Sequence, residues 1–117
     1  MSLETIIKGA LDSLVSNRVY PDVTPDSPTF PLIVYQQVGG EVVEYLEGEL
    51  CDKDHARVQV WIWATTRIAV STLARQVREA LVEGSAKATT YNAPVSVYDE
   101  ALKKYGAQID FSIWYTP

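Results

Sequence analysis

The chain has 117 residues, of which 47% are hydrophobic and 21% charged, and its formal net charge is −5. These values are typical of one globular domain over residues 1–117 that buries its core without disulfide or metal staples. The negative net charge argues against a protein that attracts nucleic acid over its whole surface. We expect no signal peptide, because no basic segment followed by an apolar run occurs. We expect no membrane span, because no run of about 18 apolar residues occurs.

Apolar residues at steps of three and four predict two amphipathic helices. The first covers about residues 3–16, with Ser2 as its cap and Asn17 at its end. The second begins after the threonine pair 65–66, and Gly84 occupies the place of a left-handed C-terminal cap. Three arginines lie off its apolar stripe, which favours a solvent-facing side over a DNA-binding patch; they are Arg67, Arg75 and Arg78.

A proline-rich stretch follows the first helix. Residues 20–31, YPDVTPDSPTFP, hold four prolines, each of which fixes φ and lacks a backbone donor. We therefore expect a long extended loop here, and long ordered loops are often functional.

Alternating and β-branched segments predict the strands. The first is 32–40, and 41–50 either extends it or forms a further exposed strand. The next is 57–66, reached through a polar loop. Segments 95–102 and 107–116 form a terminal hairpin around a turn at Lys103 to Gly106.

The order of elements is thus α-β-β-α-β-β. It predicts an α+β fold with a four-stranded, mainly antiparallel sheet and both helices packed on one face.

The strand RVQVWIWATT at 57–66 has no polar face. Two helices cover one face of the sheet, so either the tryptophans or the aliphatic residues are left over. Two exposed tryptophans would present roughly 300–500 Å², as much as the largest patch on a typical monomer. We favour a subunit interface; the alternative is that segment 41–55 or the proline loop folds over this face. One face of the strand carries Val58, Val60, Ile62 and Ala64, and the other Gln59, Trp61, Trp63 and Thr65.

Groups that carry catalysis are scarce. His55 is the only histidine and Cys51 the only cysteine, so no intrachain disulfide forms. Cys51 and His55 supply two of the four ligands that structural zinc needs, and we interpret their segment as a solvated turn. Gly39-Gly40 lacks the spacing of a phosphate-binding loop. We predict no catalytic, cofactor-binding or metal residue, and no enzyme.

Six acidic residues crowd one segment against a single lysine. Such a run is usually a solvated edge that resists aggregation, and it also suits a pore through which DNA slides without sticking. The residues are Glu41, Glu44, Glu47, Glu49, Asp52 and Asp54.

Three stretches together resemble the tail-completion or tail-terminator family (minor tail proteins) of long-tailed bacteriophages and prophages. They are VYPDVTPDSPTFPLIVYQQVGG at 19–40, RVQVWIWATT with ARQVREAL within 57–81, and YDEALKKYGAQIDFSIWY at 98–115. The tyrosine-proline loop leading into PLIVYQ is the most specific part, and the resemblance runs over about residues 3–116.

This resemblance implies a structural, non-catalytic protein of the virion tail, assembled in the host cytoplasm. Its copies would form a ring, commonly a hexamer, on the last ring of tail-tube protein. There they would end tube growth and present a surface to the head-tail connector, without specific nucleic-acid or membrane binding.

Candidate residues follow from joining this resemblance to the residue patterns. The acidic run is the candidate lumen or exposed acidic face. The candidate subunit interface is Tyr35, Gln37, Trp61, Trp63 and Trp114, and the candidate loop for the tube or connector is Pro21, Asp22, Pro25, Asp26 and Pro28.

Two other classes stay open. One is another neck protein, such as a head-closure or connector subunit, which only its binding partner would distinguish. The other is a small α+β enzyme or ligand-binding domain, which a deep apolar pocket with paired polar groups would favour.

Overall fold

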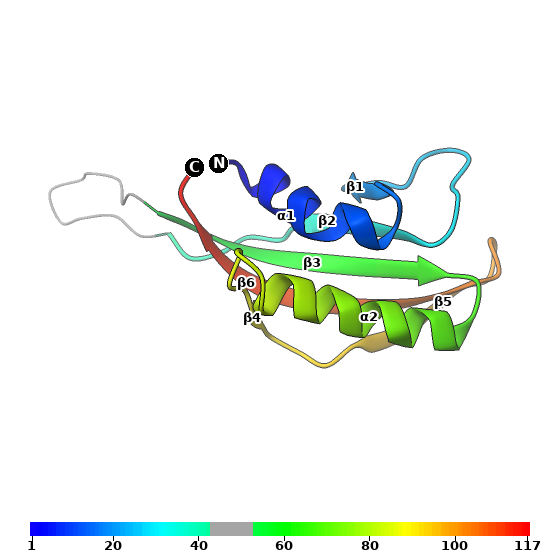
Figure 1. Cartoon of the computed structure of the whole chain (residues 1–117). Coiled ribbons are helices and arrows are strands. Elements are labelled where there is room, and N and C mark those ends of the chain that lie inside the picture. Colours follow the sequence, from blue (N-terminus) through cyan, green and yellow to red (C-terminus); the bar gives the residue numbers. More distant parts are fainter. Residues whose placement is uncertain (43–52) are drawn as a thin grey trace, which may run out of the picture.

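The first helix begins at a side-chain cap. The computed structural model describes residues 1–42 and 53–117 (Figure 1). Helix α1 covers Leu3–Leu11, and the hydroxyl of Ser2 accepts a hydrogen bond from the Thr5 amide at 3.2 Å. A 3₁₀ turn, η1 (Asp12–Leu14), continues it. Left-handed backbone at Ser16–Asn17 then ends the helical segment, which confirms the predicted end.

Strands β1 (Val19–Pro21) and β2 (Leu32–Gln37) run parallel. Part of the predicted loop is therefore a strand. Two parallel neighbouring strands cannot be joined by a tight turn, because the chain must first return to the end of the sheet at which the first strand began. The proline-rich segment makes that return, and this explains its length. Pro21 ends the edge strand, where its missing donor costs no ladder bond.

Two long antiparallel strands form the centre of the sheet. Strand β3 (Asp54–Ala64) pairs along its whole length with β6 (Lys104–Tyr115), from Asp54 opposite Tyr115 to Ala64 opposite Tyr105. Strand β2 pairs antiparallel on the other side of β3. Because β3 begins at Asp54, the prediction of a polar loop through residue 55 was wrong.

Helix α2 (Arg67–Val82) connects β3 to the C-terminal strands. Thr66 is its cap and accepts a hydrogen bond from the Ala69 amide at 3.1 Å. Gly84 does not adopt the left-handed conformation expected of it. A side chain there would instead collide with the carbonyl oxygen of Ala80, so close approach explains the glycine. Among the described residues, neither helix has the length and apolar character that a membrane crossing requires.

Strands β4 (Thr89–Thr90) and β5 (Val95–Asp99) both pair antiparallel with β6. The predicted hairpin is β5–β6, with its turn at 100–103, slightly earlier than expected. The sheet order is β1-β2-β3-β6-β4, with β5 beside β6.

The α+β class is confirmed, whereas the predicted four-stranded, mainly antiparallel sheet needs correction. Over the described ranges the sheet is mixed and has six strands, because β1 and β4 add two strands that the sequence analysis did not predict. Of the segment proposed as a further strand, 41–50, the part from 43 on lies outside the described residues. Glu41 and Val42 belong to no strand.

Both helices cover the same face of the sheet (Figure 1). Residues of α1 and α2 form one buried cluster with alternate residues of β2, β3 and β6, and the tryptophan-bearing face stays without a helix. The residues of β2, β3 and β6 in this core are Ile33, Tyr35, Ala56, Val58, Val60, Ile62, Ile109, Phe111 and Ile113.

Candidate interaction surface

Trp61 and Trp63 stand side by side on the sheet face that no helix covers. Their rings are parallel within 3°, with centroids 6.4 Å apart. Both are half-buried, so less of their area is open to water than two fully exposed rings would present. The indole nitrogen of Trp61 donates to the Gln59 side-chain oxygen at 3.2 Å. These contacts hold the rings in one orientation.

A glycine makes room for Trp63. Gly106 pairs with Trp63 across β3 and β6, and a Cβ added to it would lie 2.6 and 2.7 Å from two atoms of the indole. The ring therefore lies across the bare backbone of β6.

Aliphatic residues extend this apolar region on both sides. Leu32 and Val34 pair with the tryptophans on β2 and are buried. On the β5 side, Val95 is 50% exposed and Val97 is half-buried. These residues and the two tryptophans form a band at the end of the sheet where β3 finishes.

Trp114 lies at the other end of the same face. It is 45% exposed, and its ring packs against His55 with centroids 4.5 Å apart. His55 is 7% exposed; its Nδ1 accepts a hydrogen bond from the Glu41 amide at 2.8 Å, which leaves its Nε2–H to donate to the Ser112 hydroxyl at 2.6 Å. His55 is thus a buried structural residue and not part of a solvated turn.

A polar cluster separates Trp114 from the other two tryptophans. The Arg57 guanidinium donates to the Asp110 carboxylate at 2.9 Å and lies over the Tyr91 ring, 4.4 Å from its centroid. The Asp110 amide donates to the Asn92 side chain at 2.9 Å. The face is therefore apolar at its ends and charged in the middle, as surfaces that select a partner often are.

The structure divides the candidate interface residues between two faces. Trp61, Trp63 and Trp114 share the uncovered face. Tyr35 points to the opposite face, into the core, and is 3% exposed. Tyr35 and Gln37 pair with Val60 and Val58 of β3, so both lie on the helix-covered face of the sheet. Placing Tyr35 and Gln37 with the tryptophans was therefore wrong.

Burial changes the acidity of Tyr35. It raises the pKa of the phenol above the usual value, and the nearby carboxylates of Glu4, Asp22 and Asp12 raise it further. No hydrogen-bond partner for the Tyr35 hydroxyl occurs among the residues that the structure describes. This tyrosine therefore fits a neutral core residue.

Two of the six acidic candidates fall within the described ranges. Glu41 and Asp54 are both exposed, at the end of the sheet where β3 begins. Over residues 1–42 and 53–117 no three histidine, cysteine or acidic side chains gather as metal ligands. The candidates Glu44, Glu47, Glu49 and Asp52, together with Cys51, lie outside the described residues.

The proline loop leaves most of its side chains in water. Pro25 and Asp26 are exposed, and Pro28 is half-buried. The Asp22 amide donates to the Tyr35 carbonyl at 2.8 Å, which ties the start of the loop to β2. Pro21, predicted as part of the loop, ends β1.

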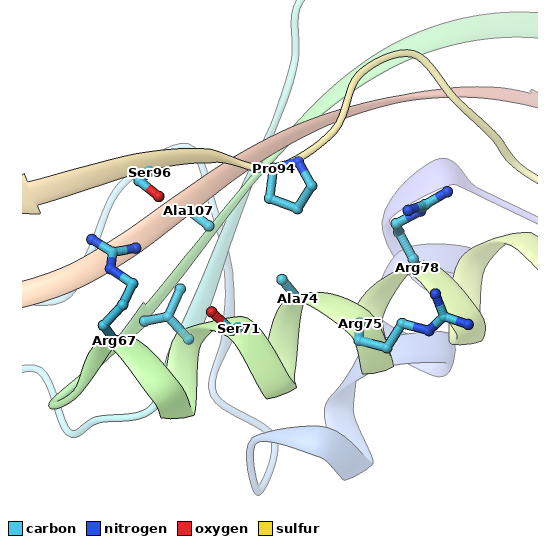
Figure 2. A pocket seen from close by; sticks show the side chains of 9 residues that line it. Arg67, Ser71, Ala74, Arg75, Arg78, Pro94, Ser96 and Ala107 are labelled. Atoms are coloured by element: carbon cyan, nitrogen blue, oxygen red, sulfur yellow. The ribbon is translucent and has the colours of Figure 1, made fainter.

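A pocket of about 160 Å³ lies between α2 and the β5–β6 edge (Figure 2). Arg67 closes one end: it donates to the carbonyls of Gly106 at 2.7 Å and Val97 at 2.9 Å. Arg75 and Arg78 border the other end. Arg75 pairs with Glu79 at 2.9 Å. Arg67 is thus a structural residue, which its place off the apolar stripe did not reveal.

Sequence reasoning also missed Tyr98 and Tyr105. Their rings lie 5.0 Å apart on β5 and β6, and both are partly exposed. The predicted turn at Lys103 to Gly106 placed Tyr105 inside the turn, so only the observed turn at 100–103 pairs the two tyrosines across the strands.

Residues 7–116 match the family of tail completion protein gp17. No curated protein matches the chain.

Proposed function

Since this chain belongs to the bacteriophage family of tail completion protein gp17, we propose that its copies form a ring that ends the tail tube and joins the tail to the head. A structural protein of the tail needs surfaces for neighbours rather than a reaction site. The observation that carries the proposal is the sheet face without a helix, on which Trp61, Trp63 and Trp114 remain partly open to water.

The tryptophan-bearing face is the proposed subunit interface. Tryptophan is enriched among the residues that dominate binding energy, and such residues work best when they are already held in place and partly desolvated. The parallel rings of Trp61 and Trp63 meet both conditions.

The tail-tube protein and the head-tail connector are the proposed partners along the ring axis. The exposed loop around Pro25 and Asp26 is the candidate contact with one of them, because the segment between β1 and β2 extends past the ends of these two strands (Figure 1). The acidic run from Glu41 to Asp54 is the candidate wall of the lumen, where negative charge would let DNA pass without binding.

Native mass spectrometry over a concentration series, with and without purified tail-tube protein, tests the ring. We expect a closed ring, alone or on tubes. A chain that stays a monomer and ignores tubes would overturn the proposal.

Two variants test the surfaces separately. Trp61→Ser with Trp63→Ser should abolish assembly while circular dichroism shows a folded monomer, and Ile68→Ser, at another exposed apolar residue, should leave assembly intact. An unfolded double variant would place the tryptophans in the core instead.

Deleting the loop tip at 24–27 should leave the folded monomer and the ring intact but block the joining of tail and head. Unchanged tail assembly would refute the loop's role.

A further inference from the structure

Two apolar clusters lie on opposite faces of the same end of the sheet. One is the band beside Trp63 on the uncovered face. The other is carried by β5, β6 and their turn, and its tyrosines point to the helix side. We name them by their aromatic residues: the tryptophan cluster is Trp61, Trp63, Val95 and Val97, and the tyrosine cluster is Tyr98, Leu102 and Tyr105.

The tyrosine cluster is partly open to water. Tyr98 is 47% exposed, Leu102 46% and Tyr105 36%. Tyr98 and Tyr105 are cross-strand partners with their rings tilted at 59°. The largest exposed apolar patch of a protein is often a functional surface.

Arg67 holds this cluster in place. Its guanidinium lies over the Tyr105 ring, 5.2 Å from the centroid, and donates to carbonyls on both strands of the hairpin, Val97 and Gly106. A side chain fixed before binding loses less entropy when a partner arrives. The two strands that carry Tyr98 and Tyr105 are therefore tied to the start of α2, although they lie next to a turn.

Both clusters are built around Gly106. On one face its bare backbone accommodates the Trp63 ring, and on the other side of the strand its carbonyl accepts the bond from Arg67 that supports Tyr105. The clusters thus sit at the same level along the strands and face opposite ways. A closed ring needs two different patches on each copy, since one patch meets a different patch of the next copy, and these two clusters meet that condition.

We propose that the tyrosine cluster of one copy docks on the tryptophan cluster of the next copy. The inference rests on the proposed ring and names the second half of its contact. The projecting Leu102 and tyrosines fit against a flatter platform of half-buried indoles, and both clusters consist of apolar and aromatic side chains that gain by covering each other.

The size of the clusters favours a second copy of this chain over a single separate partner. A stable interface buries about 800 Å² on each side, whereas three partly exposed side chains supply a few hundred. One junction is therefore weak, and closure, which gives every copy two junctions, stabilises the assembly. We expect monomers and closed rings with few dimers between them.

The first test compares two exposed aliphatic residues. Leu102→Asp should raise the concentration needed for assembly at least about tenfold, the effect of losing a residue that matters at an interface. Ile68→Asp is the matched control, because Ile68 is 80% exposed and lies outside both clusters. Its assembly should match that of the wild type. Thermal unfolding of both monomers establishes that they are folded.

The second test asks which patch meets which. In a Cys51→Ser background, chains carrying Leu102→Cys and chains carrying Val95→Cys are mixed under assembly conditions and treated with a short bis-maleimide. We expect cross-linked pairs in the mixture and none from either variant alone. Pairs formed by Leu102→Cys alone would mean like-to-like contact and overturn the inference.

The outcomes separate the two proposals. If the wild type forms rings and Leu102→Asp does so at the same concentration, the docking inference fails and the ring stands. If the wild type never assembles, with or without tubes, the proposed function fails, and the docking contact fails with it.

Discussion

Gly106 shows how one small residue organises two layers of the structure. Its missing side chain leaves space for the Trp63 ring, while its carbonyl anchors Arg67. Its φ is not positive, so the requirement is for space and not for backbone freedom. The residue matters through what lies against it.

Gly106→Ala should lower the free energy of unfolding by about 1–3 kcal/mol, the usual cost of overpacking, because its methyl group collides with the indole. The Trp63 ring must shift, so the tryptophan fluorescence should change as well. Gly9→Ala is the control: it lies in α1 with open space around it and should stabilise by about 0.5–1 kcal/mol. An unchanged stability and spectrum for Gly106→Ala would contradict the packing described for Trp63.

Tyr35→Phe should change the response to alkali. The raised pKa of Tyr35 means that the folded protein holds this proton more tightly than the unfolded chain, whose tyrosine pKa is about 10. The resulting stability is complete below pH 10 and is lost as pH rises through the higher folded pKa. The free energy of unfolding, measured with denaturant between pH 8 and 12, should therefore fall less steeply with pH in the variant.

Near neutral pH the same substitution should cost little. The hydroxyl that it removes is buried and has no partner among the described residues. The free energy of unfolding should therefore fall by less than about 1 kcal/mol, or rise. Tyr115→Phe is a useful comparison, because burial also raises the pKa of Tyr115. If Tyr35→Phe loses as much free energy of unfolding at high pH as the wild type does, Tyr35 does not titrate as described.

At the scale of elements, α2 depends on its first turn. Its cap is the Thr66 hydroxyl, and its first residue is Arg67, which supports the β5–β6 hairpin. The start of this helix and the tyrosine cluster are therefore coupled through one side chain.

Thr66→Ala should reduce stability by about 1 kcal/mol, because the Ala69 amide loses its acceptor. Thr65→Ala, one residue earlier and exposed, should have a smaller effect. Chemical denaturation of the two variants decides the point: equal losses would mean that the Thr66 hydroxyl does not act as the cap.

For the whole molecule, the two ends of the chain lie together (Figure 1). The Met1 ammonium donates to the Thr116 carbonyl at 2.9 Å, beside the start of β3. Joining these ends and opening the chain elsewhere changes connectivity without changing the core.

A circular permutant with a short glycine-serine joint, opened between Pro25 and Asp26, should fold and lose roughly 1–2 kcal/mol, because an exposed loop tolerates a break. The same joint with the opening between Val60 and Trp61, in the middle of β3, should prevent folding. Far-UV circular dichroism and thermal unfolding compare the two. Equal behaviour would contradict the central role of β3 in the sheet.

The sequence determined the elements whose signals are local. The spacing of Leu3, Ile7 and Leu11 predicted α1, and alternation predicted β3 and the terminal hairpin. Ser2 was predicted as the first cap, whereas the sequence left open which residue of the threonine pair 65–66 starts the second helix. Each of these signals comes from residues close together in the sequence. Helical periodicity and capping also act between residues that are only a few positions apart. The resemblance of whole stretches to a tail-completion family is confirmed by the family match over residues 7–116.

Only the tertiary structure decided which residues share a face and which short segments become strands. β1 forms because residues 19–21 find the open edge of β2, and Tyr35 is separated from Trp61 because the register of β2 on β3 places them on opposite sides. His55 is buried because Ser112 and the Glu41 amide meet it from distant parts of the chain. Pairings of this kind join residues far apart in sequence. A local pattern fixes the two faces of each strand but leaves open which face the helices cover.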